Sequence, residues 1–340
     1  MSLYFNKKAF AANNRDGRAV KAQFEELSTL RANTQKSMDE LHAVANTGVT
    51  PADTYREFDN TSVLEPKERG HMALCSQAMV FSRSISLGKQ VYEYRQSSRS
   101  GNASISLSGR KNIVIDHTQY GYAGTCVLVI DDAFGRTWLE QKANATEMFD
   151  GLVDDSMNSE RVVLELVDNY MWDGDSKNVK GRSWGGLRGD ASVAQAVLAV
   201  DLADNSISGK TKYDEIRRLR DILTIENDCD SFTLVISREI KSSWEEDYAI
   251  DNSSNRTVEN RIAGIAGITS IIEDAALTGN QIAMVKLGQD AFHPVVAMAL
   301  STYAIPRVGP MDDYSFVKWV MLGFIAKTSK AGKKCALYAE

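Results

Sequence analysis

The feature of the sequence that most constrains the fold is a long helical pattern, which begins at Thr137, reaches Trp172 and contains no proline. Apolar residues recur three and four positions apart along it, as on the buried face of a helix. Thr137 followed by Glu140 predicts a capping box at its start, and the polar run 154–160 leaves open a bend or a break. An unbroken helix would be roughly 50 Å long, which favours an architectural element over the core helix of a small enzyme. A glycine- and tryptophan-rich connector follows at residues 173–190.

Length and composition indicate a soluble globular protein with one large domain or two ordinary ones. The chain has 340 residues, of which 43% are hydrophobic and 25% charged, and its net charge is −6. That charge argues against a folded surface that coats nucleic acid. No stretch approaches the roughly 18 apolar residues of a membrane span, and the first residues lack the apolar core of a signal peptide. We therefore expect a protein made and kept in a cytoplasm, with no membrane partner.

Cysteine and histidine patterns indicate neither a metal site nor a nucleophilic pair. The four cysteines are widely separated and form no CxxC pair, so reduced thiols are expected. The four histidines form no HExxH motif and no metal pair. Cys75 lies four residues after His71, but no third group that would orient such a pair is apparent.

Phosphate-, calcium- and dinucleotide-binding motifs also fail. Residues 209–211 read Gly-Lys-Thr, as in a phosphate loop, but Asp204 stands where that loop needs glycine. Residues 173–175 resemble the start of a calcium loop, but Lys177 takes the place of its third oxygen ligand. The glycines at 264 and 267 lack the setting of a dinucleotide fingerprint. No catalytic, cofactor-binding or metal-binding residue is predicted, although an undetected carboxylate pair stays open.

Two segments early in the chain are basic. Residues 1–22 carry five bases against one acid and read as an arm that is mobile or docked on a neighbour. The bases of this arm are Lys7, Lys8, Arg15, Arg18 and Lys21. After a helical pattern at 23–48, short strands at 104–107 and 112–116 predict a hairpin. An isolated hairpin is marginal in water, so something else must hold it. The bases of the hairpin, with no acid between them, are Arg95, Arg99, Arg110 and Lys111.

The remaining sequence alternates between strand and helix patterns without regular βαβ repetition, which favours the α+β class. A strand at 126–130 leads towards the long helix, and residues 189–204 read as a helix or an edge element. Thr211 is expected to cap one helix, and Ser237 to open another after the buried strand Phe232–Ile236. A further helix is expected at 256–265, and strands at 268–272, 281–286, 294–305, 314–327 and 333–338.

This order of elements resembles the major capsid proteins of tailed bacteriophages and their cellular relatives, the encapsulin shell proteins. The resemblance covers most of residues 70–340 and depends on the order of elements, because no single motif is specific. The matching segments are the hairpin at 104–116, the helix at 137–172, the connector WGGLRGD at 184–190, the strand and helix at 232–244, and LGQDAF at 287–292 ahead of the β-rich end.

The resemblance implies a tailed-phage capsid or encapsulin-like fold with an N-terminal arm, an extended E-loop hairpin, a long spine helix, a peripheral domain and an axial domain. The boundaries that we expect are 1–87 for the arm and leading helices, 88–125 for the E-loop hairpin, 126–190 for the spine helix and peripheral domain, 191–310 for the axial domain, and 311–340 for C-terminal strands that return to the peripheral domain.

The resemblance also implies a structural protein and not an enzyme. Such a chain self-assembles through pentamers and hexamers into an icosahedral phage head that encloses double-stranded DNA, in the host cytoplasm, and becomes part of the virion. Scaffolding, portal and decoration proteins are the other expected partners, and no cofactor is expected. Two alternatives stay open: an encapsulin-type compartment that encloses a cargo enzyme, and a cytosolic α+β enzyme with an unrecognised carboxylate site.

The charge pattern suggests how copies of the chain would meet. Between Glu140 and Asp168 there are eight acids and two bases, and in the family the E-loop lies over a neighbouring subunit near this helix. We expect the hairpin bases to dock on an acidic surface of the adjacent copy, and the arm to bind DNA, a scaffolding protein or a neighbour. Exposed pairs contribute about 0–1 kcal/mol each, so they would set register more than strength. The acidic surface consists of Glu147, Asp150, Asp154, Asp155 and Glu160.

Overall fold

The computed structural model describes residues 72–101, 105, 117–146, 151–248 and 257–340, together with helical residues at 25–26, 28–29, 31–33 and 35–36. The chain divides into two units, Met1–Ser62 and Val63–Glu340. The described residues of the first unit fall within the helix predicted at 23–48. The basic arm at 1–22 lies outside the described residues.

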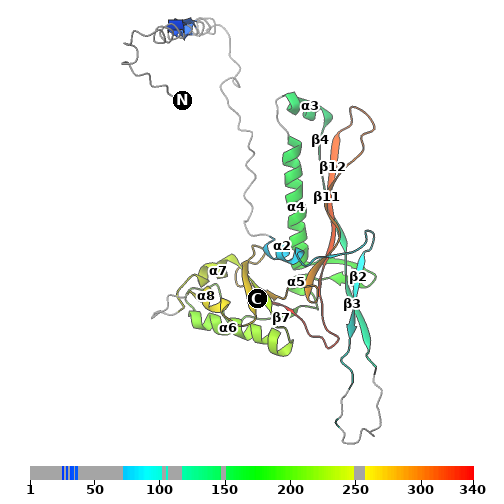
Figure 1. The fold of residues 1–340 in the computed structure, drawn as a ribbon, viewed down its shortest axis with the longest axis vertical. Coiled ribbons are helices and arrows are strands. Elements are labelled where there is room, and N and C mark those ends of the chain that lie inside the picture. Colours follow the sequence, from blue (N-terminus) through cyan, green and yellow to red (C-terminus); the bar gives the residue numbers. More distant parts are fainter. Residues whose placement is uncertain are drawn as a thin grey trace, which may run out of the picture. The chain divides into compact units, whose positions relative to one another are not determined.

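Two mixed sheets form the framework of the second unit (Figure 1). The four-stranded sheet is antiparallel except for a short parallel pair between its first two strands. Its order is β1 (Arg83–Ser84), β11 (Phe292–Ala304), β12 (Tyr314–Ala326) and β4 (Leu128–Arg136). The five-stranded sheet has the order β7 (Ala194–Ala196), β13 (Ala336–Ala339), β10 (Ile282–Val285), β8 (Phe232–Ile236) and β9 (Ile268–Glu273). The α+β class predicted from the sequence is confirmed.

The long helical pattern appears as two helices, α3 (Trp138–Thr146) and α4 (Gly151–Asp173), and residues 147–150 between them lie outside the described residues. The predicted capping box is present: the Glu140 amide donates to Thr137 Oγ1 at 3.3 Å, and the Thr137 amide donates to Glu140 Oε2 at 3.3 Å. The helix α4 continues through residues 154–160 without a break. The bend that the polar run left open is therefore absent from this part of the helix.

Alternating apolar residues explain why α4 lies along the four-stranded sheet. In β4, Ile130 is buried whereas the next residue, Asp131, is exposed, as expected for a strand with one covered face. Ile130 packs in one cluster with Val163 and Val167 of α4 and with Val320 and Leu322 of β12. The helix and the sheet therefore share a single apolar core.

The strand expected at 126–130 is in fact a junction between two strands. The first, β3 (Tyr120–Cys126), ends just before Val127, and β4 begins just after it. The Val127 amide donates to the Gln90 carbonyl at 2.9 Å and so continues the register of the β2–β3 pairing by one residue. A continuous apolar run carries no signal of where a strand changes sheet, so hydrophobicity alone could not show this break.

The connector after α4 is a tightly packed crossing of two chain segments. It contains β5 (Asp175–Val179), β6 (Arg182–Trp184) and the short helix α5 (Gly186–Gly189). Gly174 and Gly186 both have positive φ, +71° and +79°, and a Cβ on either would collide with the backbone of the other segment. The indole of Trp184 is buried and donates to the carbonyl of Tyr170 at 3.1 Å.

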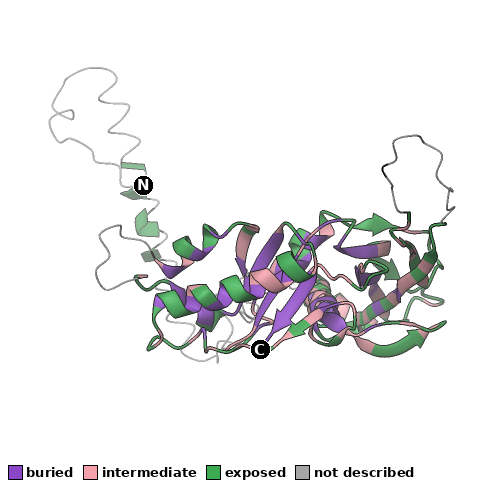
Figure 2. Cartoon of the chain, turned by 90° about the horizontal axis from the view of Figure 1, so that it is seen from below, coloured by how far each residue is buried: buried purple, intermediate pink, exposed green. Residues whose placement is uncertain are grey.

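Short helices pack around the five-stranded sheet to form a second core. Three of its strands, β8, β10 and β13, are buried at every residue, and Figure 2 shows buried residues gathered on the central strands while the outer helix faces are exposed. The packed elements are α6 (Gly209–Asp221), the π-helix η4 (Ile222–Glu226), α7 (Arg238–Trp244) and α8 (Val258–Ala263).

Helix starts in this region partly follow the sequence predictions. Ser237 opens α7 as predicted, because its side chain accepts a hydrogen bond from the Ile240 amide. The cap of α6 is Ser208 instead of Thr211, whose amide donates to the Ser208 side chain. The segment 189–204 contributes the edge strand β7, which pairs in parallel with β13.

The C-terminal strands depart from the expected boundary at residue 310. Strand β11 pairs with β12 from Phe292 to Ala304, so the return to the four-stranded sheet begins at residue 292. The turn at 305–313 closes a hairpin within one sheet and does not separate two domains, because antiparallel neighbours need only a short connection. The last strand, β13, joins the five-stranded sheet instead. Residues 311–340 are therefore shared between the sheets.

Candidate assembly surfaces

The base of the predicted hairpin is formed by β2 (Val91–Ser97) and β3, paired antiparallel with Arg95 opposite Tyr122. In Figure 1 the two strands run side by side away from the two sheets. The predicted strands at 104–107 and 112–116, with Arg110 and Lys111, lie outside the described residues apart from Ile105. The strands β2 and β3 lie at the two ends of the range 88–125 expected for the hairpin.

Contacts with two other segments support the hairpin base, as its small apolar surface requires. The Arg182 guanidinium lies 2.9 Å from Glu93 Oε1 and donates to the Tyr122 carbonyl at 3.0 Å. On the other side, Gln96 Nε2 donates to the Thr328 carbonyl at 2.8 Å. The Thr328 amide donates to the Tyr94 hydroxyl at 2.7 Å. The connector and the loop after β12 thus hold the strands that carry the basic residues.

The two described bases of the hairpin have different surroundings. The Arg95 guanidinium lies over the Tyr120 ring, 4.7 Å from its centroid, so this cation is partly engaged within its own hairpin. Arg99 is exposed near the end of the described strand segment. Arg99 is therefore the described hairpin base best placed to meet another molecule.

Two of the five predicted docking acids are paired within their own chain. Arg136 on β4 donates to Asp155 through Nε at 2.5 Å and through Nη2 at 3.1 Å, and this carboxylate raises the pKa of Arg136. Lys318 on β12 lies 2.6 Å from Glu160 Oε2. Asp154 is half-buried on the same helix, whereas Glu147 and Asp150 lie outside the described residues. The acidic surface of α4 is therefore partly neutralised by its own sheet.

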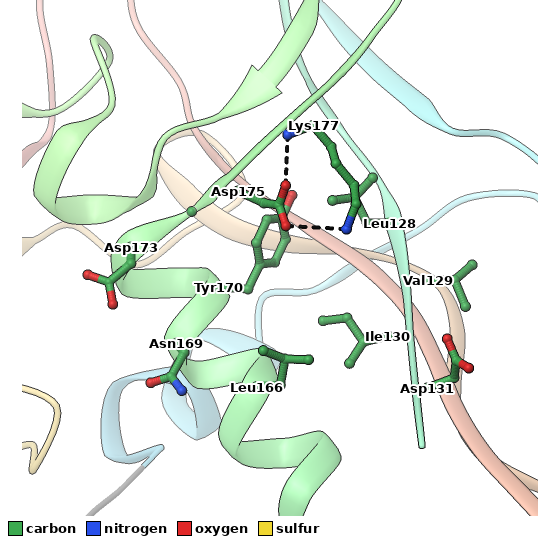
Figure 3. Close-up of a pocket in the computed structure, with 11 residues that line it drawn as sticks. Leu128, Val129, Ile130, Asp131, Leu166, Asn169, Tyr170, Asp173, Asp175 and Lys177 are labelled. Atoms are coloured by element: carbon green, nitrogen blue, oxygen red, sulfur yellow. Dashed lines mark hydrogen bonds and ion pairs between the residues drawn. The ribbon is translucent and has the colours of Figure 1, made fainter. Parts of the chain in front are cut away.

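A pocket with an acidic rim lies between α4 and β4 near the end of the helix (Figure 3). Its volume is about 310 Å³, and its apolar lining includes Ile130, Leu166 and Tyr170. Asp131, Asp173 and Asp175 stand at its margin, with the amide of Asn169. Two of these carboxylates have cationic partners, because Asp173 lies 2.5 Å from Arg188 Nη1 and Asp175 lies 3.4 Å from Lys177 Nζ.

The apolar lining of this pocket and the carboxylates at its margin suit a cationic side chain with an apolar stem better than a metal ion. Across the described residues, no group of three or more His, Cys, Asp or Glu side chains is arranged to hold a metal. Long basic side chains bury their methylene groups on apolar surface and keep the charge near water. The pocket offers both environments within one surface.

A second groove, on the other side of α4, is almost entirely apolar. Its volume is about 490 Å³, and it lies between α2 (Ala73–Met79), α4 and the β11–β12 pair. Met79, Leu164, Leu300 and Leu322 contribute to its lining. Leu164 and Leu166, which line the two grooves, belong to the same apolar run as the core residues Val163 and Val167, so the helix pattern alone could not separate groove from core. Exposed apolar side chains of α4 are Val153, Met157, Val162 and Leu166.

The residues considered for chemistry do not form a reactive site in the described part of the chain. Burial, followed by the nearby carboxylates of Asp168 and Asp274, raises the pKa of the Cys75 thiol to about 12, which disfavours the nucleophilic thiolate. Its possible partner, His71, lies outside the described residues. No described helix is both long enough and apolar enough to cross a membrane.

The chain belongs to a family of unknown function, DUF6260, whose model matches residues 43–339. Its sequence matches no curated protein. The structure is similar to the capsid of Myoviridae phage XM1, with a TM-score of 0.65 and 10% identity, over 86% of this chain and 99% of that one. It is also similar to a chain of Mycobacterium phage Che8, with a TM-score of 0.55 and 10% identity, over 86% of this chain and 98% of that one.

A virus-like particle from Pyrococcus furiosus is also similar, with a TM-score of 0.50 and 10% identity, over 77% of this chain and 91% of that one. Because each of these chains is only 10% identical to this one, the similarities establish a shared fold. The chain has the tailed-phage capsid and encapsulin-like fold that the order of its elements predicted.

Proposed function

We propose that the chain is a phage major capsid protein, which self-assembles through pentamers and hexamers into an icosahedral head that encloses double-stranded DNA. The observation that carries this proposal is the similarity to the XM1 capsid chain over 99% of that chain's length, so the whole shell subunit has a counterpart here. The hairpin that leaves the body supports it, because closed shells need repeated interfaces between copies. The role is structural and not catalytic.

In this proposal the four-stranded sheet with α4 corresponds to the peripheral domain and the five-stranded sheet with its helices to the axial domain. The C-terminal segment would then contribute to both, because β12 and β13 lie in different sheets. Further copies of the chain and the packaged DNA would be its principal partners, with scaffolding, portal and decoration proteins as additional ones. The protein would assemble in the host cytoplasm and remain in the virion.

We infer that the hairpin bases dock on an acidic surface of the adjacent copy. The exposure of Arg99 supports this contact. Asp155 and Glu160 already have cationic partners, as do Asp173 and Asp175 of the pocket beside β4. The exposed carboxylate of Asp131 at that pocket would extend the surface for a basic side chain. The arm at 1–22 would bind DNA, a scaffolding protein or a neighbour, and its deletion tests that role by assembly and packaging.

An encapsulin-type compartment is the second candidate, and the similarity to the virus-like particle supports it at a lower TM-score. Nucleic-acid absorbance of purified, nuclease-treated particles separates the two, since a phage head protects DNA and a compartment protects a cargo protein. Gel filtration separates both from a cytosolic enzyme. A small discrete oligomer under all assembly conditions would favour the enzyme and contradict both shell proposals.

A further inference from the structure

Two cysteines that are far apart in the sequence meet where the last strand begins. Cys229 lies in the turn between η4 and β8, and Cys335 immediately precedes β13. Both are free thiols packed in the same apolar cluster, and each is close enough to shift the pKa of the other. Cys229 is buried in the core around the five-stranded sheet, whereas Cys335 is half-buried at its margin. Cys335 is therefore the more accessible of the two cysteines.

Contacts on both sides hold the two cysteine-bearing segments in register. The Lys334 amide donates to Asn227 Oδ1 at 2.9 Å, and the Lys333 ammonium pairs with Asp228. The Cys229 amide donates to the Leu223 carbonyl at 3.0 Å, which fixes the turn from its other side. The proximity of the thiols thus follows from the backbone and does not depend on their own contact.

The electrostatic surroundings give the two thiols different properties. The hydrogen bond from Cys229 and the nearby Lys286 ammonium lower the pKa of Cys335, while that hydrogen bond and burial raise the pKa of Cys229. Lys286 is held in place by Asp230 at 3.0 Å and Asp290 at 3.3 Å. Thiolates beside a cation are the form of cysteine that reacts with oxidants. Cys335 is therefore suited to attack, and Cys229 to resolve the product.

We propose that Cys229 and Cys335 are a redox-active pair that a peroxide converts to an intramolecular disulfide. The Cys335 thiolate attacks one peroxide oxygen, the O–O bond breaks, and Cys335 becomes a sulfenic acid while hydroxide leaves. The Cys229 sulfur then attacks the Cys335 sulfur, the S–S bond forms, the S–O bond breaks, and the hydroxyl group leaves with the Cys229 proton as water. The hydroxide takes up the proton that Cys335 lost, so two thiols give up two electrons and one hydrogen peroxide becomes two waters.

The disulfide would tie the turn before β8 to the start of β13 and enclose the strands from β8 to β12 in one covalent loop. A link across so long a segment restricts the unfolded chain and raises the stability of the sheet. This inference concerns the chain itself and stands apart from the proposal of shell assembly.

Hydrogen peroxide on the reduced, full-length protein tests the pair, with denaturing alkylation afterwards to count the remaining thiols. The expected product has lost two thiols and about 2 Da, the mass of two hydrogen atoms, and yields a proteolytic peptide pair that links Cys229 to Cys335. The melting temperature should rise on oxidation. Oxygen adducts without that link, or both thiols still reduced after a peroxide treatment that oxidises them in the urea-unfolded chain, would overturn the proposal.

Serine variants separate the two roles while changing little volume. In Cys335→Ser, peroxide should leave Cys229 reduced and the melting temperature unchanged. In Cys229→Ser, it should leave a sulfenic acid at Cys335 that a dimedone probe traps. Equal labelling of both cysteines in the two variants would contradict the assignment of attacking and resolving thiols. Should either variant fail to fold, the linked peptide of the wild-type protein still decides the proposal.

Discussion

The ammonium group of Lys318 on β12 lies 2.6 Å from a carboxylate oxygen of Glu160 on α4. The Lys318 side chain is 5% exposed and that of Glu160 49% exposed, so a nearly buried cation depends on an acid at the surface. The pair crosses from sheet to helix, with Val320 of the same strand packed in the apolar core nearby. It therefore links the two elements that the fold places against each other.

Replacing Glu160 and replacing Lys318 should lower the free energy of unfolding by different amounts. Glu160→Gln leaves the buried ammonium without its counter-charge, and we expect a loss of about 1–2 kcal/mol, less than for a fully buried pair because water reaches Glu160. Lys318→Met removes the buried charge and should cost less, because its replacement is apolar. Urea unfolding of both variants measures the order. A larger loss for Lys318→Met would show that the ammonium is well solvated without Glu160.

In the connector, the backbone at Gly186 packs so closely against the backbone of residues 172–174 that no side chain larger than hydrogen should fit at position 186. Gly186 and Gly181 have the same φ of +79°, but a Cβ at Gly186 would meet the backbone of residues 172–174, whereas nothing lies within 4 Å of one at Gly181. Gly181→Ala should cost about 1 kcal/mol, the left-handed backbone penalty alone. Gly186→Ala should cost at least roughly 2 kcal/mol more, because the two segments must separate. Equal unfolding midpoints for the two variants would contradict the crowding.

The buried imidazole of His293 predicts a loss of stability in mild acid. Burial, followed by the Lys327 charge, lowers its pKa to about 4, against roughly 6.5 in the unfolded chain. The unfolded state therefore takes up the proton first, and stability falls as the pH drops from roughly 6.5 towards 4 and then levels off. Between pH 7 and pH 5 the imidazole should account for a loss of about 2 kcal/mol.

Two variants isolate this effect from other titrating groups. His293→Leu should lose that part of the pH dependence, as measured by urea unfolding at pH 7 and pH 5. His117 is exposed, so His117→Leu serves as the control and should retain the wild-type dependence. The same slope for all three proteins would show that His293 does not titrate differently in the folded and unfolded states.

Charge reversal in the hairpin tests the proposed docking between copies. Arg99→Glu combined with Arg110→Glu should weaken assembly, most strongly at low salt, because like charges would meet on the acidic surface. Arg95 is left unchanged, since its contact with Tyr120 supports the hairpin. The control with the same change in net charge is Lys210→Glu with Arg217→Glu, at two exposed positions on α6. Particle yield by sedimentation compares them, and normal shells from the hairpin variant at low salt would refute the docking.

Local patterns in the sequence were sufficient for elements that depend on neighbouring residues. The capping box at Thr137 and the Ser237 cap involve residues three positions apart, and the strand Phe232–Ile236 is apolar throughout because both its faces are buried. Strand β11 lies before the boundary expected at 310 and pairs with β12 beyond it, and a hairpin turn has the same signal in the sequence as a passage between domains. The partners Glu160 and Lys318 are separated by 158 positions, so only the folded chain brings them together.

The candidate surfaces were less predictable than the fold, for the same reason. The charges of the bases and acids can be read from the sequence, but Arg136 and Lys318, which neutralise two of the acids, come from strands whose packing against α4 has no local signal. The cysteine pair was missed because spacing rules detect ligands that are close in sequence. Cys229 and Cys335 meet only through the pairing of β13 with β10 in the five-stranded sheet.

Cryo-electron microscopy of particles assembled from the purified full-length chain tests the capsid assignment most directly. We expect closed icosahedral shells built of pentamers and hexamers, in which the hairpin of β2 and β3 from each copy lies on α4 or β4 of its neighbour. Only small, discrete oligomers across the full range of salt and protein concentration, or shells in which the hairpin contacts no neighbouring copy, would contradict it.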